Sequence, residues 1–298
     1  MKIAVTGARS FVGAALHAYC ETHGVEWVGI DLGPTGARQS ISADIGRPGW
    51  EAALPAGVDA IVHLAAISRD ADCRQDPARA LEVNITGTWR VIDAARARGI
   101  GQIVFASSEW VYGDVDAELK TEETPIDAAS ISSEYPLTKL AGERLLAMAA
   151  ARGTLAAATV LRFGIIYGPR PSNWSAVETM NDAVATRDRI EVGSLDTARR
   201  FIHVDDIAAG IASSLGRGRS GFEVFNLTGD RLVTLGGIIE ESVRLHGRAP
   251  VVEERTPGRA SVRNIGNAKA RRVLGWEPRI GLRQGLETLL ASPVAVAS

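Results

Sequence analysis

The first stretch of the chain, MKIAVTGARSFVGAALHAYCETHGVEWVGID at 1–31, decides the fold. Its apolar start predicts a strand at Lys2–Thr6, because a short, polar-free and β-prone run is typical of a parallel strand that is buried on both faces. The pattern then predicts a helix over Phe11–His23 and a second strand over 25–30. A strand, a glycine-bearing turn, a helix and a strand that ends in an acid, Asp31, are the parts with which a chain holds a dinucleotide.

Two glycines shape the turn after the first strand. Gly7 permits the tight turn out of the strand, and Gly13 lets the helix pack closely on the sheet. The helix N-terminus then offers free N–H groups and a partial positive charge to a pyrophosphate. The predicted cofactor contacts in this turn are Gly7, Ser10, Phe11, Val12 and Gly13.

Asp31 predicts which dinucleotide is bound. It stands 24 residues after Gly7, at the end of the second strand, where an acid accepts hydrogen bonds from both ribose hydroxyls of the adenosine. Its charge would repel a 2′-phosphate, so the sequence favours NAD over NADP. Arg9 and Arg38 keep the alternative open, since either cation could reach a 2′-phosphate.

Two later strand ends extend the predicted site. A strand over 58–64 is followed by small residues, which allow a cofactor to lie against the backbone. A short strand over 39–43 leads to Asp44, which is either a partner of the adenine amino group or a turn aspartate. His63 is either a catalytic base or, as we favour, a strand histidine at the edge of the core. The cofactor contacts predicted here are Asp44, Ile45, Leu64, Ala65 and Ala66.

Composition narrows the class of protein. The chain has 298 residues, a net charge of −2 and 46% hydrophobic residues, as expected for one large α/β domain or two lobes that share an interface. This charge favours neither nucleic acid nor an anionic membrane as a partner. Cys20 and Cys73 are too few for a disulfide framework or a zinc cage and suit a reducing compartment. With no long apolar run and no signal stretch, the sequence predicts a soluble, cytoplasmic protein without a metal.

The alternation of predicted strands and helices divides the chain into a sheet domain and a smaller lobe. Alternating strands and helices over 1–165 predict a Rossmann-type, doubly wound parallel sheet that binds NAD. After Pro171 this alternation loosens, and the segment 198–227 is predicted to return to the sheet. The remaining segments, 166–197 and 228–298, are predicted to form a smaller α/β lobe that binds the substrate.

Polar side chains that suit redox chemistry follow the fifth predicted strand. That strand ends near Ser108 and Glu109, and the carboxyl end of a parallel strand is where ligands bind. A helix predicted over 134–152 then carries Tyr135 and Lys139, whose i, i+4 spacing places them on one face.

In this order the motifs resemble those of the extended short-chain dehydrogenase/reductase superfamily, in particular the NAD-dependent epimerase/dehydratase family. The resemblance covers nearly the whole chain, and it rests on the order of the motifs more than on any one of them. The supporting stretches are TGARSFVG (6–13), HLAA (63–66), NITGT (84–88), SSEWVYG (107–113), YPLTK (135–139), YGP (167–169), RRFIHVDD (199–206) and LGWEP (274–278).

The resemblance implies a role for each residue of the site. Ser108 should hydrogen-bond the reacting oxygen, and Tyr135 should act as general base in oxidation and general acid in reduction. A tyrosine is a poor base at its usual pKa of about 10, so the cation of Lys139 and the oxidised nicotinamide should lower that pKa. Lys139 should also hold the nicotinamide ribose. Asn84, on a helix predicted over 77–98, should join the cofactor contacts.

The resemblance also bears on the substrate. Glu109 either contacts the substrate or faces solvent, and the sugar dehydratases of this family carry a glutamate where this chain has Trp110, which argues against 4,6-dehydration. Arg199 matches an arginine that binds the diphosphate of a nucleotide sugar, whereas Ile165 and Thr256 replace two other diphosphate contacts. The predicted substrate contacts are Ser108, Glu109 and Arg199.

The sequence therefore favours an NAD-dependent enzyme that oxidises a secondary hydroxyl of a sugar or nucleotide sugar. A nucleotide-sugar epimerase is slightly preferred, and a dehydrogenase of a free sugar, sugar acid or small polyol is the alternative. A non-catalytic NAD sensor on the same fold is a third hypothesis, which the intact Ser108, Tyr135 and Lys139 disfavour. The resemblance further implies a homodimer, in which the helices at 77–98 and 134–152 of two subunits form a four-helix bundle.

Overall fold

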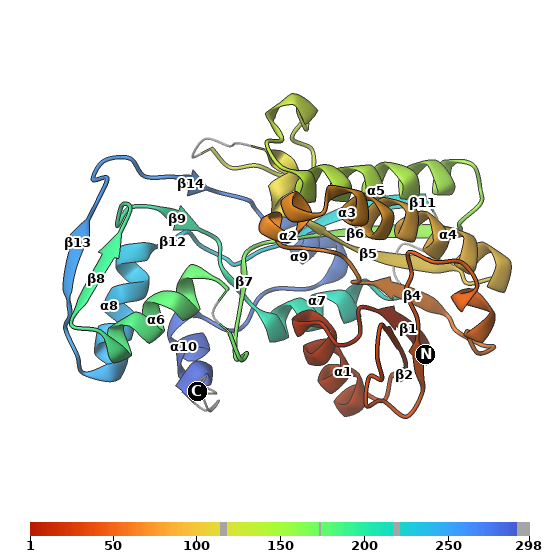
Figure 1. The fold of residues 1–298 in the computed structure, drawn as a ribbon, viewed down its shortest axis with the longest axis horizontal. Helices are drawn as coiled ribbons and strands as arrows, with labels where there is room; N and C mark the ends of the chain where they lie inside the picture. Colours follow the sequence, from red (N-terminus) through yellow and green to blue (C-terminus); the bar gives the residue numbers. More distant parts are fainter. Residues whose placement is uncertain (114–117, 173, 217–220, 291–298) are drawn as a thin grey trace.

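A seven-stranded parallel sheet forms the centre of the protein (Figure 1). The computed structural model describes residues 1–113, 118–172, 174–216 and 221–290. The strand order β11-β6-β5-β4-β1-β2-β3 is that of a doubly wound Rossmann-type sheet and confirms the predicted fold class. The strands are β1 (Lys2–Thr6), β2 (Glu26–Asp31), β3 (Ser40–Ser42), β4 (Ala60–His63), β5 (Gln102–Ser108), β6 (Ala157–Phe163) and β11 (Gly221–Leu227).

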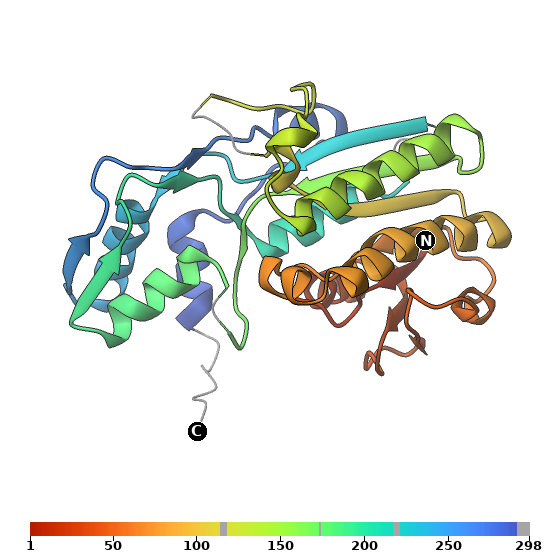
Figure 2. The same cartoon turned by 45° about the horizontal axis from the view of Figure 1, so that its top comes forward.

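Apolar side chains on both faces of the sheet explain why its strands form. Along β1, Ile3 and Val5 belong to the core on one face and Ala4 to the core on the other, and all three are fully buried. Helices α4 and α5 cover the face of Ala4, and helices α1, α7 and α9 cover the opposite face (Figures 1 and 2). Apolar runs of this kind are typical of parallel strands between two helix layers. The helices are α1 (Phe11–His23), α4 (Gly87–Arg98), α5 (Glu134–Ala151), α7 (Val204–Ser214) and α9 (Ala268–Leu274).

The region predicted as one helix over 77–98 is divided in the structure. It consists of α3 (Pro77–Leu81), a π-helical turn (Glu82–Thr86) and α4, and a short helix α2 (Asp70–Gln75) precedes it. A π turn places each N–H against the carbonyl five residues back and so inserts one extra residue into a helix. The prediction of a regular helix was therefore wrong at this turn, which contains the buried Asn84.

A smaller lobe lies beside the sheet (Figures 1 and 2). Two of its strands, β8 and β13, pair at its outer edge, and β12, β9 and β14 form a second small sheet. Within the segment 198–227, α7 and β11 lie on the large sheet, whereas β9 belongs to the smaller lobe's sheet. The remaining elements are β7 (Ile166–Tyr167), α6 (Ala176–Thr186), β8 (Arg189–Val192), β9 (Ala198–Arg199), β10 (Ile202–His203), β12 (Val233–Thr234), α8 (Leu235–His246), β13 (Val251–Glu254), β14 (Val262–Arg263) and α10 (Leu282–Leu290).

A buried ion pair fixes α5 against the sheet. Arg162, on β6, donates two hydrogen bonds to the carboxylate of Glu143, with N–O distances of 2.9 and 2.7 Å, and both side chains are almost fully buried. Ser107 donates a third hydrogen bond to Glu143, at 2.6 Å. Removing one partner of such a pair typically costs 3–5 kcal/mol, because the other charge stays buried and unpaired. Since Glu143 lies one helical turn after Lys139, this pair also fixes the position of that lysine.

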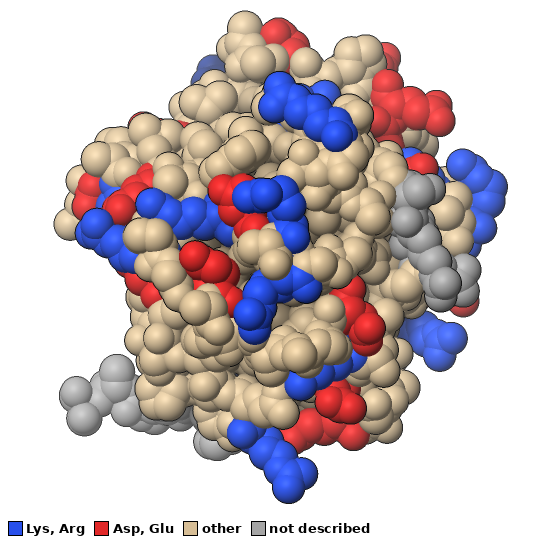
Figure 3. Space-filling model, turned by 90° about the vertical axis from the view of Figure 1, so that its right-hand side faces the viewer, with Lys and Arg blue, Asp and Glu red and all other residues tan. Residues whose placement is uncertain are grey.

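The outer surface carries both signs of charge. On the face drawn in Figure 3, basic and acidic side chains are interspersed over an otherwise neutral surface. Within the described ranges, no helix combines the length and the apolar character needed to cross a membrane.

Candidate active site

The turn between β1 and α1 has the shape that a dinucleotide requires. Gly7 has a φ of +71°, and a Cβ placed on it would lie 2.6 Å from the backbone nitrogen of Ala65, so no larger residue fits. Ser10 caps α1, and its hydroxyl oxygen accepts a hydrogen bond from the N–H of Gly13 at 3.0 Å. The first turn of α1 carries no acidic side chain, so its partial positive charge remains available to a phosphate. These residues fit a bound dinucleotide.

Asp31 ends β2 next to this turn. Its two carboxylate oxygens accept hydrogen bonds from the backbone N–H groups of Arg9 and Leu32, each at 2.8 Å. A carboxylate has about four acceptor sites, so both oxygens are still able to accept from ribose hydroxyls. The guanidinium of Arg9 lies at the same strand end, since a Cβ on Gly33 would approach its Nη1 to 2.7 Å. The arginine that could favour NADP is thus close to Asp31, while Arg38 is exposed.

Asp44 is engaged by protein groups. One carboxylate oxygen accepts from the N–H of Gly46 at 2.8 Å, and the other is paired with Arg79. Burial acts to raise the pKa of Asp44, but the hydrogen bonds from Arg79 and Gly46 bring that pKa below its usual value. This geometry is that of a turn aspartate, and the contact with adenine stays a prediction. The neighbouring Ile45 is buried in the core.

Asn84 joins the loop after β4 to the helix of the predicted catalytic residues. Its amide accepts from the N–H of Ile67 at 2.8 Å and donates to the carbonyl of Ile67 at 2.9 Å. It also donates to the hydroxyl of Thr138, on α5, at 3.0 Å. The loop that contains the predicted contacts Leu64, Ala65 and Ala66 is thereby held in one position beside α5.

His63 is locked into a directional chain of hydrogen bonds. The hydroxyl of Thr88 donates to the carbonyl of Asn84, so it accepts from Nε2 of His63, 3.0 Å away. Nδ1 of His63 must then accept from the hydroxyl of Thr6, 2.7 Å away. Burial, together with the charge of Lys139, lowers the pKa of His63 to about 3. The ring is therefore neutral and fully bonded, which supports the interpretation as a strand histidine.

Ser108, Tyr135 and Lys139 come together at the carboxyl end of β5. The hydroxyl of Ser108 lies close enough to the phenol of Tyr135 to act on its pKa, and the backbone N–H of Trp110 donates to the oxygen of Ser108 at 3.3 Å. The Nζ of Lys139 lies 5.8 Å from the ring centre of Tyr135 and 4.9 Å from that of Phe105. One phenol, one hydroxyl and one ammonium group therefore share a site.

The protein's own groups do not lower the pKa of Tyr135. Burial raises the pKa of this phenol above its usual value, and the hydroxyl of Ser108 offsets only part of the increase. Burial also lowers the pKa of Lys139 to about 8, although the nearby Cys73 and Glu143 act in the opposite direction. Lys139 alone therefore does not bring the pKa of Tyr135 below its usual value. The predicted phenolate also needs the second positive charge named above, that of the oxidised nicotinamide.

Glu109 is a buried carboxylate beside Ser108. Its side chain is 1% exposed, which excludes the alternative that it faces solvent, and neither of its oxygens has a hydrogen-bond partner among the described residues. Burial raises its pKa to about 7, although the charges of Arg263 and Arg199 act to lower it. A buried polar group without a partner is costly and needs an explanation, and a perturbed pKa in such a place is typical of functional sites.

Arg263, on β14, is a site residue that the sequence did not predict. Its guanidinium is buried, donates to the carbonyls of Glu109 and Gly113, and lies 4.2 Å from the ring centre of Trp110. Its Nε is 3.8 Å from a carboxylate oxygen of Glu109. The two residues are 154 positions apart, so no local pattern could have indicated the contact.

Three positions correspond to diphosphate contacts in the family that the sequence resembles, and the protein itself engages all three; only Arg199 was predicted to keep this role. The guanidinium of Arg199 donates to the carbonyl and to the hydroxyl of Ser261. Ile165 packs against an apolar cluster of the smaller lobe, and the hydroxyl of Thr256 donates to the carbonyl of Gly193 at 2.9 Å. Arg199 is thus the single predicted diphosphate contact that keeps a cationic side chain near Glu109.

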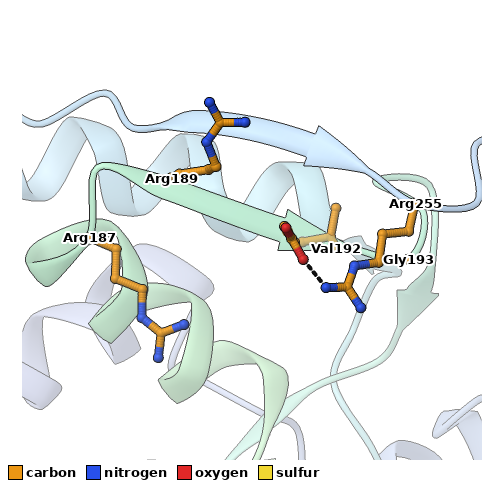
Figure 4. A pocket seen from close by; sticks show the side chains of 6 residues that line it. Arg187, Arg189, Val192, Gly193 and Arg255 are labelled. Atoms are coloured by element: carbon orange, nitrogen blue, oxygen red, sulfur yellow. Dashed lines mark hydrogen bonds and ion pairs between the residues drawn. The ribbon is translucent and has the colours of Figure 1, made fainter.

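A surface pocket of about 600 Å³ lies elsewhere, at the outer edge of the smaller lobe (Figures 1 and 4). It contains Arg255, which is paired with Glu191 across β8 and β13 (Figure 4). None of the residues that line it is a predicted site residue; they are Arg187, Arg189, Glu191, Val192, Gly193 and Arg255. In the described part of the chain, His, Cys, Asp and Glu side chains do not gather into a group of three or more that could hold a metal ion.

Comparison with known proteins identifies the family. Residues 3–228 match the model of the NAD dependent epimerase/dehydratase family. The chain belongs to this family. Membership confirms the predicted enzyme class and the dependence of the family on NAD.

Several relatives match over almost their whole length. A GDP-6-deoxy-D-mannose reductase from Pseudomonas aeruginosa is 28% identical, over 97% of this chain and 96% of its own. A UDP-glucose 4-epimerase from Corynebacterium glutamicum is 27% identical, over 93% and 91% respectively. The solved structure of MoeE5 in complex with UDP-glucuronic acid and NAD superimposes with a TM-score of 0.84 at 28% identity, and the match covers 98% of each chain. These family members therefore include both reductases and epimerases.

Replacing Glu109 by glutamine should change how stability depends on pH. The folded protein keeps a proton on Glu109 up to a pH of about 7, whereas the unfolded chain, with a glutamate pKa of about 4.3, has already released it. Stability should therefore fall as the pH rises through this window, by up to about 4 kcal/mol. Glu109→Gln should lack this fall and be the more stable protein above neutral pH, as measured by urea unfolding at a series of pH values.

The matched control for this prediction is Glu240→Gln, because Glu240 is an exposed glutamate on α8. This variant should keep the pH dependence of the unsubstituted protein. An unchanged pH dependence in Glu109→Gln would show that the buried carboxylate does not hold a proton near neutral pH.

Proposed function

We propose that the protein is an NAD-dependent nucleotide-sugar epimerase that oxidises a secondary hydroxyl through Ser108, Tyr135 and Lys139. The observation that supports the proposal is that Ser108 and Lys139 lie beside one phenol: the hydroxyl of Ser108 acts to lower the pKa of Tyr135, and the Nζ of Lys139 is 5.8 Å from its ring centre. Two relatives support the substrate class: a UDP-glucose 4-epimerase, and MoeE5, which was solved with UDP-glucuronic acid and NAD.

In this proposal Ser108 positions the reacting hydroxyl and Tyr135 transfers its proton. Ser108 holds the reacting hydroxyl, and its own oxygen is positioned by the N–H of Trp110. Tyr135 accepts the hydroxyl proton in oxidation and returns it in reduction. The bound dinucleotide supplies the hydride acceptor and the additional positive charge that favours a phenolate. The first turn of α1 and the carboxylate of Asp31 would hold its pyrophosphate and its ribose.

Glu109 and Arg199 are the proposed substrate contacts beside Ser108. The two oxygens of Glu109 accept no hydrogen bond from the described residues, so they suit the hydroxyl groups of a sugar. Trp110 stands where the family's dehydratases carry a second acid, so this pair of positions offers one carboxylate only. The arrangement supports oxidation and reduction of a hydroxyl over elimination of water.

A dehydrogenase of a free sugar, sugar acid or small polyol is the second candidate. The observation that favours it is the hydrogen bonding of Arg199 to Ser261, together with the apolar Ile165 at a position where the family's enzymes bind a diphosphate. Such an enzyme would release NADH in every turnover, whereas an epimerase returns the hydride to the other face of the sugar. A third candidate, a non-catalytic NAD sensor, would not depend on Tyr135.

Replacing Tyr135 by phenylalanine should lower turnover by about 10²- to 10⁴-fold, because it removes the general acid–base group and little else. Binding of NAD, measured by calorimetry, should change little. Tyr19→Phe is the matched control, since it removes a hydroxyl from a tyrosine of α1 that stacks on His23. Equal turnover in Tyr135→Phe and the unsubstituted protein would exclude the enzymatic site proposed here.

A substrate screen separates the two enzymatic candidates. Nucleotide sugars, free sugars and sugar acids are incubated with the protein and NAD, and both NADH absorbance and product stereochemistry are recorded. An epimerase should invert one carbon of a nucleotide sugar without accumulating NADH. Steady NADH formation from a sugar without a nucleotide would instead establish the dehydrogenase.

We also propose that the protein forms a homodimer through α4 and α5. These helices lie side by side on one face of the sheet (Figures 1 and 2). They carry large apolar side chains that are exposed in the monomer, among them Trp89 (38% exposed) and Met148 (41% exposed). Exposed apolar residues that gather on one face are typical of an interaction surface.

A charge at this surface should prevent dimer formation. The double variant Trp89→Glu, Met148→Glu would bury two carboxylates in the proposed interface, so its mass in solution, measured by light scattering, should be that of a monomer. Val251→Glu is the control, because Val251 is exposed on β13, in the other lobe. A monomeric unsubstituted protein, or an unchanged dimer in the double variant, would contradict the proposal.

A further inference from the structure

The segment after β7 is organised around one buried carboxylate. Glu178, in the first turn of α6, is 3% exposed and accepts hydrogen bonds from three backbone N–H groups, with distances between 2.7 and 3.1 Å. The guanidinium of Arg170 adds two more, at 2.7 and 2.9 Å. The three N–H donors are those of Gly168, Trp174 and Ser175. This carboxylate therefore holds Arg170 and the backbone of Trp174 in fixed positions.

Three contacts between cations and rings link four side chains on this support. The guanidinium of Arg170 lies 4.4 Å from the ring centre of Phe11 and 5.3 Å from that of Trp174. Trp174 also contacts the guanidinium of Arg69, 4.0 Å from a ring centre. These distances are within the range of cation–π attraction. We call the linked series Phe11–Arg170–Trp174–Arg69 the tryptophan bridge.

The tryptophan bridge joins the two loops that are proposed to hold the dinucleotide. Phe11 is the first residue of α1 and lies in the turn after β1, whereas Arg69 follows the loop after β4. Strands β1 and β4 are paired neighbours, so their carboxyl ends, and the loops that leave them, lie next to each other. The bridge therefore runs from the helix terminus that suits a pyrophosphate to the loop that Asn84 holds beside α5.

The Arg69 end of the bridge also lies near the proposed catalytic residues. Asp70, the next residue, accepts a hydrogen bond from the hydroxyl of Ser133 at 3.0 Å, and Ser133 precedes Tyr135 by two residues. The charge of Asp70 acts on the phenol of Tyr135. One end of the bridge is therefore at the pyrophosphate end of the proposed cofactor site, and the other is at its reactive end.

We propose that the tryptophan bridge retains the bound dinucleotide, with Arg170 and Trp174 as positioning residues that slow its release. The inference rests on the proposed function for the presence of the dinucleotide, and it adds which residues keep it in place. In this proposal the dinucleotide leaves the site past the bridge, so the contacts of Trp174 with Arg69 and of Arg170 with Phe11 must break for release. Retention of the cofactor between half-reactions is what an epimerase needs, because the hydride must return to the same sugar.

The test is the rate at which NADH leaves the full-length protein. NADH is bound, an excess of NAD is added, and the loss of the fluorescence of bound NADH is followed in time. Trp174→Ala should release NADH about 5- to 30-fold faster than the unsubstituted protein, because it removes two exposed cation–π contacts. Trp174→Phe keeps an aromatic ring for both arginines to contact and should release NADH at nearly the original rate.

Two further variants make the test specific. Arg69→Gln removes one contact without touching Glu178, and it should also accelerate release, by a smaller factor. Lys269→Gln is the matched control: Lys269 lies on α9, outside the proposed site, and its replacement removes a cation from another aromatic ring, that of Phe225 at 4.8 Å, so it should leave the release rate unchanged. Thermal unfolding establishes that each variant is folded.

The outcomes distinguish this inference from the proposed function. If Trp174→Ala and Arg69→Gln are folded and release NADH at the original rate, the tryptophan bridge does not retain the cofactor. Equal acceleration in Lys269→Gln would also overturn the inference, because the effect would then not be specific to the bridge. If the unsubstituted protein binds neither NAD nor NADH, the proposed function fails, and this inference fails with it.

Discussion

The close approach of Gly7 to Ala65 is the constraint on which the rest of the site depends. A Cβ at Gly7 would overlap the backbone of Ala65, so the loops after β1 and β4 meet only because this position is glycine. The N–H of Ala65 donates to the hydroxyl of Thr6, which begins the chain of hydrogen bonds through His63. That chain ends at the carbonyl of Asn84, whose side chain holds both the loop after β4 and α5. The position of α5, the helix of the proposed catalytic residues, is thus connected by successive hydrogen bonds to the contact at Gly7.

Local patterns predicted the parts of the structure that are determined locally. The strands of the large sheet were found because a strand between two helix layers is apolar on both faces, and Gly7 and Asp31 were found because a strand and a helix frame them. The π turn at Asn84 was missed, because its residues have ordinary helix-forming patterns and the extra residue is stabilised by contacts with Ile67 and Thr138. Arg263 was missed for the same physical reason, because its partner Glu109 is 154 positions away. Glu178 was missed although the sequence marks it: Ser175 and Glu178 have the spacing of a capping box, and the partners of Glu178 lie within ten residues.

Two buried carboxylates differ in whether the protein itself supplies their hydrogen bonds, and this difference separates a structural role from a role in ligand binding. Glu143 and Glu109 are both almost fully buried near the carboxyl end of β5. Glu143 receives hydrogen bonds from Arg162 and Ser107, so its charge is compensated within the protein and its role is to fix α5. Glu109 has an arginine nearby but no hydrogen bond, so its desolvation is not compensated by the chain itself. A carboxylate of the second kind lowers stability, and a ligand that donates hydroxyl groups to it would recover part of that free energy on binding.

This uncompensated carboxylate also bears on the choice between epimerase and dehydrogenase. Ligand binding that satisfies Glu109 ties substrate affinity to the hydroxyl groups of the sugar, so the protein depends less on a diphosphate contact at Ile165 or Thr256. The structure therefore removes part of the objection to an epimerase that the missing diphosphate contacts raised. If the tryptophan bridge retains the dinucleotide as proposed, it would remove a further part, because the cofactor would stay bound while the sugar is reduced again. Substrate recognition through hydroxyl groups and slow cofactor release are separate properties, and an epimerase with few diphosphate contacts needs both.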